Sequence, residues 1–303
     1  MNPGSYFFMP EEDYHKDPCD EPSLSRSTIL DLVTKTPRHA FENHPRLNPQ
    51  AEEEQKEIYD IGSAAHSLLL QGIDKAAEVP YDDWRKKEAK DLRDQWRALG
   101  HYPLLTKHYT SVVEMVQAAK DFLKNCELEI KSLQDEGQSE VTYIWKDGSV
   151  WCRARLDWIQ HDKKMVIDYK TTGLLADPAT YERNAINTGL DIQDQFYRQG
   201  VNSVDGHDPL FVFLIQETQK PYLCSLVQLN EPYHDMAAQK IDRAKRLWLK
   251  CLRENNWPAY PLSISIIDPP DWAMAQWEKK MLLEGDAYQK MKWSKERLEA
   301  EIG

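Results

Sequence analysis

The chain has 303 residues with 38 basic and 50 acidic side chains, which give it a formal net charge of −12. A chain of this length buries roughly 75% of the surface that its unfolded form exposes, so it can form a hydrophobic core of its own. The acidity argues against a protein that coats nucleic acid broadly, although net charge does not exclude a local basic groove, and no run of about 20 apolar residues predicts a membrane span.

The N-terminus and the cysteines indicate the cellular setting. Residues 1–23 are acidic and contain proline, and they lack the basic start and apolar stretch of a secretory signal, so we expect a loosely ordered leader. The five cysteines are scattered and form no CxxC pair, which argues against a disulfide framework and against a zinc ribbon. A cytoplasmic protein is the simplest expectation.

Helical patterns fill the first half of the chain. Ser25 precedes apolar residues at helical spacing and Pro37 follows them, which predicts a short capped helix. Longer helices are predicted over residues 52–70, 82–99 and 111–132.

Short runs of β-branched and aromatic residues come next, at Val141–Trp145, Val150–Ile159 and Met165–Thr171. With Asp147-Gly148 as a hairpin signal between the first two, these runs predict a three-stranded antiparallel meander. The remaining predicted elements are a helix ending near Gln199, strands over residues 210–216 and 222–229, a helix over residues 235–255 and a helical segment after Pro270.

The order of these elements predicts an α/β protein in which helices flank a mixed sheet. No internal repeat divides the chain. We therefore expect one domain over residues 24–303, with its core at about residues 52–230 and C-terminal helices at about residues 231–303.

The meander carries the residues with the clearest chemistry. Asp168 and Lys170 alternate along one strand and so share a face, and a tight hairpin would bring Asp157 of the preceding strand beside Asp168. Two close carboxylates repel each other unless a cation lies between them, and oxygen ligands suit Mg²⁺ or Mn²⁺. Lys170 could then orient or deprotonate a water, or neutralise phosphate charge. A surface hairpin with a cross-strand salt bridge explains the same three residues, so spacing alone leaves both interpretations open.

Two helical pairs flank this strand pattern. Gly62 and His66 are four residues apart, as are Gln193 and Tyr197, so each pair shares a helix face. The glycine permits close approach of another element. Taken alone, a histidine of this kind is more often a hydrogen-bonded core residue than a ligand, and ordinary packing explains the second pair.

The ordered set is more specific than its parts. GxxxH on an early helix, Arg155-x-Asp157, Asp168-x-Lys170 on the next strand and QxxxY on the following helix resemble the RecB-like branch of the PD-(D/E)xK nuclease superfamily. The segments over residues 61–70 and 151–172 are most similar to the exonuclease VIII (RecE-type) group. The resemblance implies a restriction-endonuclease-like α/β core, with a mixed central sheet, an antiparallel meander and flanking helices. Many members have Glu in place of Asp168, and both residues supply oxygen ligands.

The resemblance also implies roles for individual residues. The implied metal ligands are His66, Asp157, Asp168 and the backbone carbonyl of Tyr169. Lys170 would be the catalytic lysine, and Gln193 and Tyr197 would support the site and contact the DNA backbone. Glu140 matches the position of an additional acidic residue, although an exposed strand-edge glutamate is an equal alternative.

The function implied by the resemblance is a Mg²⁺-dependent exonuclease that degrades linear double-stranded DNA from 5′ to 3′ and leaves 3′ single strands for annealing-type recombination. Its implied partners are double-stranded DNA ends and a RecT-like single-strand annealing recombinase, and its subunits would form a ring. The alternatives are a Cas4-like or other RecB-family nuclease acting on single-stranded ends, a catalytically inactive DNA-binding relative, and a non-nuclease hydrolase with a carboxylate metal site. The scattered cysteines argue against the iron–sulfur cluster of a Cas4-like enzyme.

Basic residues concentrate on two predicted helices. On the later helix, five of them recur at three- and four-residue steps and form the predicted DNA-binding stripe: Lys240, Arg243, Arg246, Lys250 and Arg253. A second stripe consists of Lys86, Lys90, Arg93 and Arg97. Basic faces in an acidic protein are candidates for phosphate contact, and a solvated face with salt bridges is the alternative for each.

Overall fold

A computed structural model of the chain describes residues 1–49, 57–128 and 130–285. The chain forms two compact units, Met1–Ala259 and Tyr260–Gly303. Cys251 is the last buried hydrophobic residue along the described chain, and it lies within the first unit. One domain over residues 24–303 stays a prediction. In the second unit a helix over residues 271–285 confirms the helical segment predicted after Pro270. No helix in the described ranges combines the length and apolar character needed to cross a membrane.

The first unit is built around a six-stranded mixed sheet with the strand order β1-β4-β5-β6-β7-β8. Its strands are β1 (Gly4–Tyr6), β4 (Gly137–Asp147), β5 (Val150–Gln160), β6 (Met165–Thr172), β7 (Leu210–Glu217) and β8 (Cys224–Val227). Only the pairing of β6 with β7 is parallel, and the other neighbours are antiparallel. A separate parallel pair consists of β2 (Ala76–Val79) and β3 (Tyr102–Leu105).

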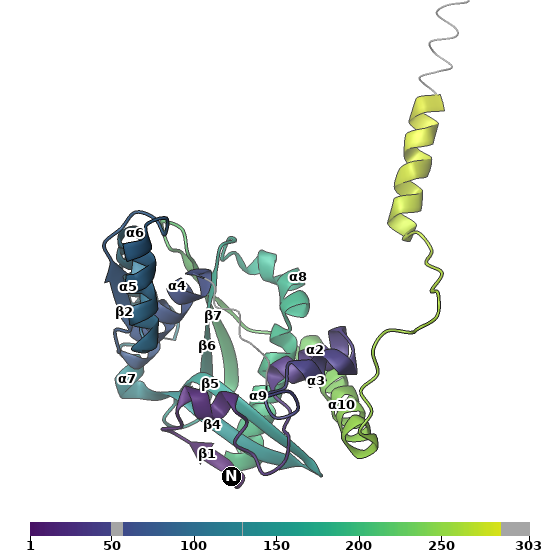
Figure 1. Ribbon diagram of the computed structural model, residues 1–303, viewed down its shortest axis with the longest axis horizontal. Helices are drawn as coiled ribbons and strands as arrows, with labels where there is room; N and C mark the ends of the chain where they lie inside the picture. The colour runs from purple at the N-terminus through teal and green to yellow at the C-terminus, as the bar shows by residue number, and fades with distance from the viewer. Residues whose placement is uncertain (50–56, 129, 286–303) are drawn as a thin grey trace, which may run out of the picture. The chain divides into compact units, whose positions relative to one another are not determined.

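Helices cover both faces of the sheet (Figure 1). One layer consists of α2 (Arg26–Thr34), α3 (Pro37–Glu42), α9 (Leu190–Asp205) and α10 (Glu231–Glu254). The other consists of α4 (Glu57–His66), a π-helical turn (Ser67–Gln71), α5 (Lys87–Ala98) and α6 (Thr106–Asn125), together with β2 and β3. The remaining labelled helices are α1 (Glu11–His15), α7 (Leu133–Glu136) and α8 (Pro178–Thr188).

Each helical layer encloses its own hydrophobic cluster against the sheet. Phe196, Phe213 and Trp248 belong to the cluster beneath α9 and α10, and Met115 and Trp158 belong to the cluster beneath α4 and α6. Burying one such side chain contributes about 1.5–3 kcal/mol. Because both faces are covered, the central strands are buried on both sides.

Local sequence signals explain most of the predicted elements. The Ser25 hydroxyl accepts a hydrogen bond from the Thr28 amide and caps α2 as expected. The antiparallel meander is confirmed, with Asp147 opposite Val150 across a tight turn in which Gly148 adopts a φ of +58°. Helix α4 begins at Glu57, and the earlier part of the helix predicted from residue 52 lies outside the described residues.

The N-terminal segment differs from its prediction. Strand β1 pairs with β4, with Ser5 opposite Tyr143, and Met9 and Tyr14 join a small hydrophobic cluster with Trp151. The expectation of a loosely ordered leader over residues 1–23 is therefore wrong. One of its acids, Asp17, finds buried partners that lie far away in the sequence, which composition does not reveal.

Asp17 is the main buried anchor of this segment. Its carboxylate accepts hydrogen bonds from the amide and the hydroxyl of Ser23, both at 2.8 Å, and lies 3.3 Å from Arg153 Nη1 and 3.4 Å from His44 Nε2. Burial alone would raise the pKa of Asp17, but the hydrogen bond from His44, the charge of Arg153 and the Ser23 donors lower it from 3.8 to about 2.

This shift predicts a contribution of Asp17 to acid stability. A pKa depressed from 3.8 to about 2 stabilises the folded state by about 2 kcal/mol at neutral pH. The contribution is complete above the unfolded pKa and is lost as the pH falls through the folded pKa. Urea unfolding of Asp17→Asn and of the parent protein from pH 7 down to pH 3 measures it. The two free energies of unfolding should converge as the pH falls, and a gap that stays constant with pH would contradict the assignment.

Candidate active site

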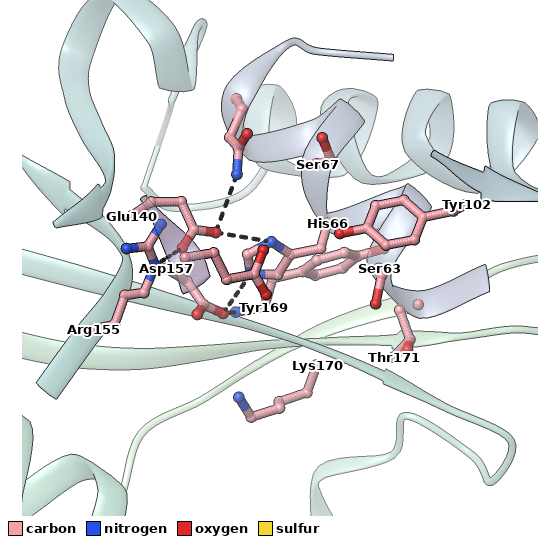
Figure 2. A pocket seen from close by; sticks show the side chains of 13 residues that line it. Ser63, His66, Ser67, Tyr102, Glu140, Arg155, Asp157, Tyr169, Lys170 and Thr171 are labelled. Carbon is pink, nitrogen blue, oxygen red and sulfur yellow. Dashed lines mark hydrogen bonds and ion pairs between the residues drawn. The ribbon is translucent and has the colours of Figure 1, made fainter. Parts of the chain in front are cut away.

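The candidate active site lies where β5 and β6 separate. The two strands pair at Trp158↔Ile167 and Ile159↔Val166, and beyond these pairs the carboxylate of Asp157 accepts the hydrogen bond of the Tyr169 amide at 2.9 Å. A side chain thus takes the place of a backbone carbonyl in the ladder. The opening is a cavity of about 530 Å³ whose lining includes His66, Asp157 and Lys170 (Figure 2).

His66 enters this cavity from the last turn of α4. A Cβ at Gly62 would lie 3.1 Å from Thr171 Oγ1, so the predicted need for a small residue is explained by the close approach of the helix to β6. His66 Nε2 lies 3.1 Å from Asp157 Oδ2, and His66 Nδ1 lies 3.2 Å from Glu140 Oε1. The histidine therefore joins two carboxylates from two neighbouring strands (Figure 2).

Glu140 is held in place by three neighbours. Besides His66, it contacts Arg155 Nε at 2.5 Å and Gln71 Nε2 at 3.2 Å. Its backbone has a φ of +58° within β4, a strained conformation of the kind that clusters at functional sites. The alternative of an exposed strand-edge glutamate is therefore wrong, since this side chain is 19% exposed and fully engaged.

Asp168 lies behind the cavity rather than in its wall. It is completely buried, its carboxylate pairs with the ammonium of Lys170, and it accepts a hydrogen bond from the amide nitrogen of Gln193. Lys170 reaches the cavity with 33% of its side chain exposed. The alternation predicted for β6 thus places both residues on one face of the sheet. Asp168 is buried there, and the side chain of Lys170 is partly exposed.

Gln193 and Tyr197 approach this face from α9. Gly189, with a φ of +70°, ends α8 and begins α9, which fixes the start of the helix that carries both residues. The two side chains are only 5% and 8% exposed. Their burial leaves little surface for the DNA contact that the resemblance implies, so support of Asp168 is the role that the packing favours.

The crowding of charge shifts the pKa values of the site. Burial would raise the pKa of Asp157, but the nearby charges of His66 and Lys170 lower it. Burial, followed by the charge of Asp157, raises the pKa of Asp168. Burial would lower the pKa of His66, yet Asp157 and Glu140 raise it to about 9. Burial would lower the pKa of Lys170, but Asp168 and Asp157 together raise it. The cluster therefore attracts positive charge.

The residues fit a divalent cation by their chemistry. Within the described ranges, no group of three His, Cys, Asp or Glu side chains is already arranged to hold a metal ion. Asp157 and Glu140 are paired with His66, and Asp168 is paired with Lys170. The donor set of carboxylates with one imidazole nevertheless suits Mg²⁺ or Mn²⁺. A bound cation would replace the proton that the carboxylates favour on His66.

Three further cavity residues had no signal in the sequence. Glu11 comes from the N-terminal segment, Tyr102 from β3 and Gln71 from the π-helical turn after His66. In such a turn the hydrogen bonds run from i to i+5, which brings Gln71 near the side of the helix that carries His66. Neither this turn nor the packing of α1 follows from a local pattern.

The predicted DNA-binding stripe lies on α10. Arg243, Arg246, Lys250 and Arg253 are exposed, and in the part of the chain that the structure describes none of the four forms an ion pair. Lys240 differs, because its ammonium lies 2.6 Å from the buried carboxylate of Asp191. Four of the five residues are thus available for phosphate contact. In the second stripe, Arg97 is engaged with Asp60.

The fold and the site together define a member of the PD-(D/E)xK nuclease superfamily. It has a mixed sheet with helices on both faces, and the strand with Asp168 and Lys170 lies beside the strand that carries Asp157. The chain belongs to the family of the PDDEXK-like domain of unknown function (DUF3799), whose model matches residues 25–268. The predictions of this superfamily and of its fold are confirmed. The finer similarity to the RecE-type group is not established by this match.

Two solved structures were compared with the chain. The crystal structure of a "putative exonuclease" from Eubacterium rectale shares 15% identity with a TM-score of 0.55, and the match covers 84% of this chain and 96% of that one. At this identity the likeness shows the fold alone. SSO0001 shares 10% identity with a TM-score of 0.27 over 65% of this chain and 88% of that one. A search of the curated proteins found no match.

Proposed function

We propose that the protein is a Mg²⁺-dependent DNA exonuclease that degrades linear double-stranded DNA, with 5′-to-3′ polarity, and leaves 3′ single strands. One observation carries the nuclease part of this proposal. Asp157, His66 and Glu140 meet in one cavity where β5 and β6 part, and Lys170 enters the same cavity. An isolated surface hairpin with a salt bridge would need neither a histidine from a distant helix nor a cavity.

Four groups would hold the cation: His66, Asp157, Asp168 and the carbonyl of Tyr169. In an extended strand the N–H and C=O of one residue lie on the same edge. Because the Tyr169 amide is bonded to Asp157, its carbonyl lies on the Asp157 side as well. A bound Mg²⁺ or Mn²⁺ would supply a water of lowered pKa and charge for the scissile phosphate.

The protein's own groups then act around that phosphate. The Lys170 ammonium is available to orient the attacking water or to neutralise developing negative charge. Gln193 holds Asp168 from behind, and Arg155 and Gln71 hold Glu140, which in turn positions the His66 ring. These supporting contacts keep Asp168, Glu140 and the His66 ring each in one orientation.

The 5′-to-3′ polarity, the RecT-like annealing partner and the ring-shaped homo-oligomer rest on the ordered motifs alone. The match to the DUF3799 family supports a nuclease that acts on DNA and does not distinguish these points. They remain predictions of the similarity to RecE-type enzymes, as does a role in recombination.

Digestion of DNA labelled at each end tests the proposal. Linear duplex, nicked circular and single-stranded DNA are incubated with the full chain in Mg²⁺ and in EDTA. We expect Mg²⁺-dependent loss of the 5′ label from linear duplex, with long single strands left behind. Cleavage of single strands or circles would retain the nuclease and reject the exonuclease assignment, and absence of cleavage with Mg²⁺ and with Mn²⁺ would overturn the proposal.

The exposed cations of α10 should contribute to DNA affinity. The double variant Arg243→Gln/Arg246→Gln is expected to bind duplex DNA more weakly and to lower the slope of log K against log salt by roughly 0.9 for each phosphate that the variant no longer neutralises. Fluorescence anisotropy over a salt series measures both effects. Lys120→Gln/Lys124→Gln on α6 makes the same charge change elsewhere and serves as the control. Equal slopes for the two double variants would show that the stripe is only a solvated face.

A further inference from the structure

Two phenylalanines of the N-terminal segment face solvent beside the active site. Phe7 is 39% exposed and Phe8 is 90% exposed, in the bend between β1 and α1. The bend is anchored on both sides, because Tyr6 pairs with Thr142 of β4 and the carbonyl of Met9 accepts a hydrogen bond from Arg155 Nη1 at 2.9 Å. A ring as exposed as that of Phe8 adds almost nothing to the core, so folding does not explain it.

These rings border a groove that continues the catalytic cavity. The groove has a volume of about 560 Å³, and Glu11, Gln71, Glu140 and Arg155 line both the groove and the cavity. A strand whose phosphate lies at Lys170 and Asp157 could therefore extend directly into the groove.

The lining of the groove suits bases better than phosphates. Beyond the two rings it includes Leu70, Gln134, Gln138 and Lys75. The carboxylates of Glu11 and Glu140 border the groove as well, and they disfavour a run of phosphates along it. Aromatic rings stack on any base, and amide side chains can bond to base edges, which are free only in an unpaired strand.

We propose that this groove binds the unpaired bases of a DNA strand next to the scissile phosphate, with the Phe8 ring stacked on one of them. The inference rests on the proposed nuclease function and extends it, because it assigns the substrate a short unpaired segment at the site. It also gives residues 1–24, which lie outside the matched family region, a part in substrate binding.

Photocrosslinking places the bases relative to Phe8 without any cleavage. Oligonucleotides that carry 5-iododeoxyuridine at successive positions from the end are bound to the full chain in EDTA and irradiated, and the crosslinked peptide is identified by mass spectrometry. We expect Phe8 to crosslink at one or two adjacent positions near the end. DNA that binds and crosslinks only to other residues would overturn the proposal while leaving the nuclease function intact.

Variants of Phe8 test the stacking itself. Phe8→Leu keeps an apolar side chain without a ring and should weaken binding of a duplex with a single-stranded end by roughly 5- to 100-fold. Phe8→Trp should retain binding, and Leu223→Ala, which also removes an exposed apolar side chain, should have no effect. Equal affinity of Phe8→Leu and the parent protein would overturn the proposal. A chain that neither binds nor cuts any DNA would overturn the proposed function first, so the two failures are distinguishable.

Discussion

Replacement of Lys170 by methionine is expected to lower the rate of DNA cleavage by about 10²–10⁴-fold, the range that positioned acid–base groups contribute. The methionine keeps much of the length and volume of the lysine and removes its ammonium, which pairs with buried Asp168 and reaches the catalytic cavity. Single-turnover digestion of an end-labelled duplex in Mg²⁺ measures the loss. Binding of the same duplex in EDTA should change little, because Lys170 is one cation among several.

A second substitution separates the two roles available to Lys170. Lys170→Arg keeps the positive charge, but its guanidinium does not deprotonate in proteins. Substantial activity of the arginine variant would assign the lysine to charge stabilisation, and loss as deep as in the methionine variant would favour proton transfer or precise orientation of water. Lys164→Met, on the exposed hairpin between β5 and β6, serves as the control. Cleavage by Lys170→Met at the parent rate would contradict the proposed site.

The sheet at the centre of this site was largely predictable from sequence. Alternation along residues 165–171 correctly placed Asp168 and Lys170 on one face, and Asp147-Gly148 correctly marked the first hairpin. These are short-range effects, because side-chain alternation and turn conformation depend on a few neighbouring residues. The ordered motifs also brought together residues from two helices and two strands, which no single pattern could do.

Features that depend on distant residues were not predictable. The local sequence predicts that Asp17 is a solvent-exposed acid in a polar leader. Its contacts with Arg153 and His44 form only when the chain has folded. Likewise, the left-handed backbone of Glu140 has no local signal, because Arg155, Gln71 and His66 hold its side chain after the sheet and α4 have packed. The first unit ends at Ala259, shortly after the last buried hydrophobic residue. The amino-acid composition around this point does not indicate the boundary.

Replacement of Asp157 by asparagine is expected to weaken divalent metal binding by more than about tenfold, since even residues that only support a metal ligand cost about 10–100-fold in affinity when changed. The fold should tolerate the change. The amide oxygen of asparagine can still accept the hydrogen bond of the Tyr169 amide, which holds the separating strands at this point. What is lost is the negative charge that faces His66 at 3.1 Å.

Titration of Mn²⁺ into the DNA-free protein by calorimetry measures this effect apart from catalysis. Asp162→Asn, on the exposed turn between the same two strands, removes one carboxylate of equal charge and should bind Mn²⁺ like the parent protein. Unchanged Mn²⁺ binding by Asp157→Asn, together with a loss of cleavage, would place the metal elsewhere and leave Asp157 the task of orienting His66. Joint loss of Mn²⁺ binding and of cleavage would instead tie both to the carboxylate at which β5 and β6 part.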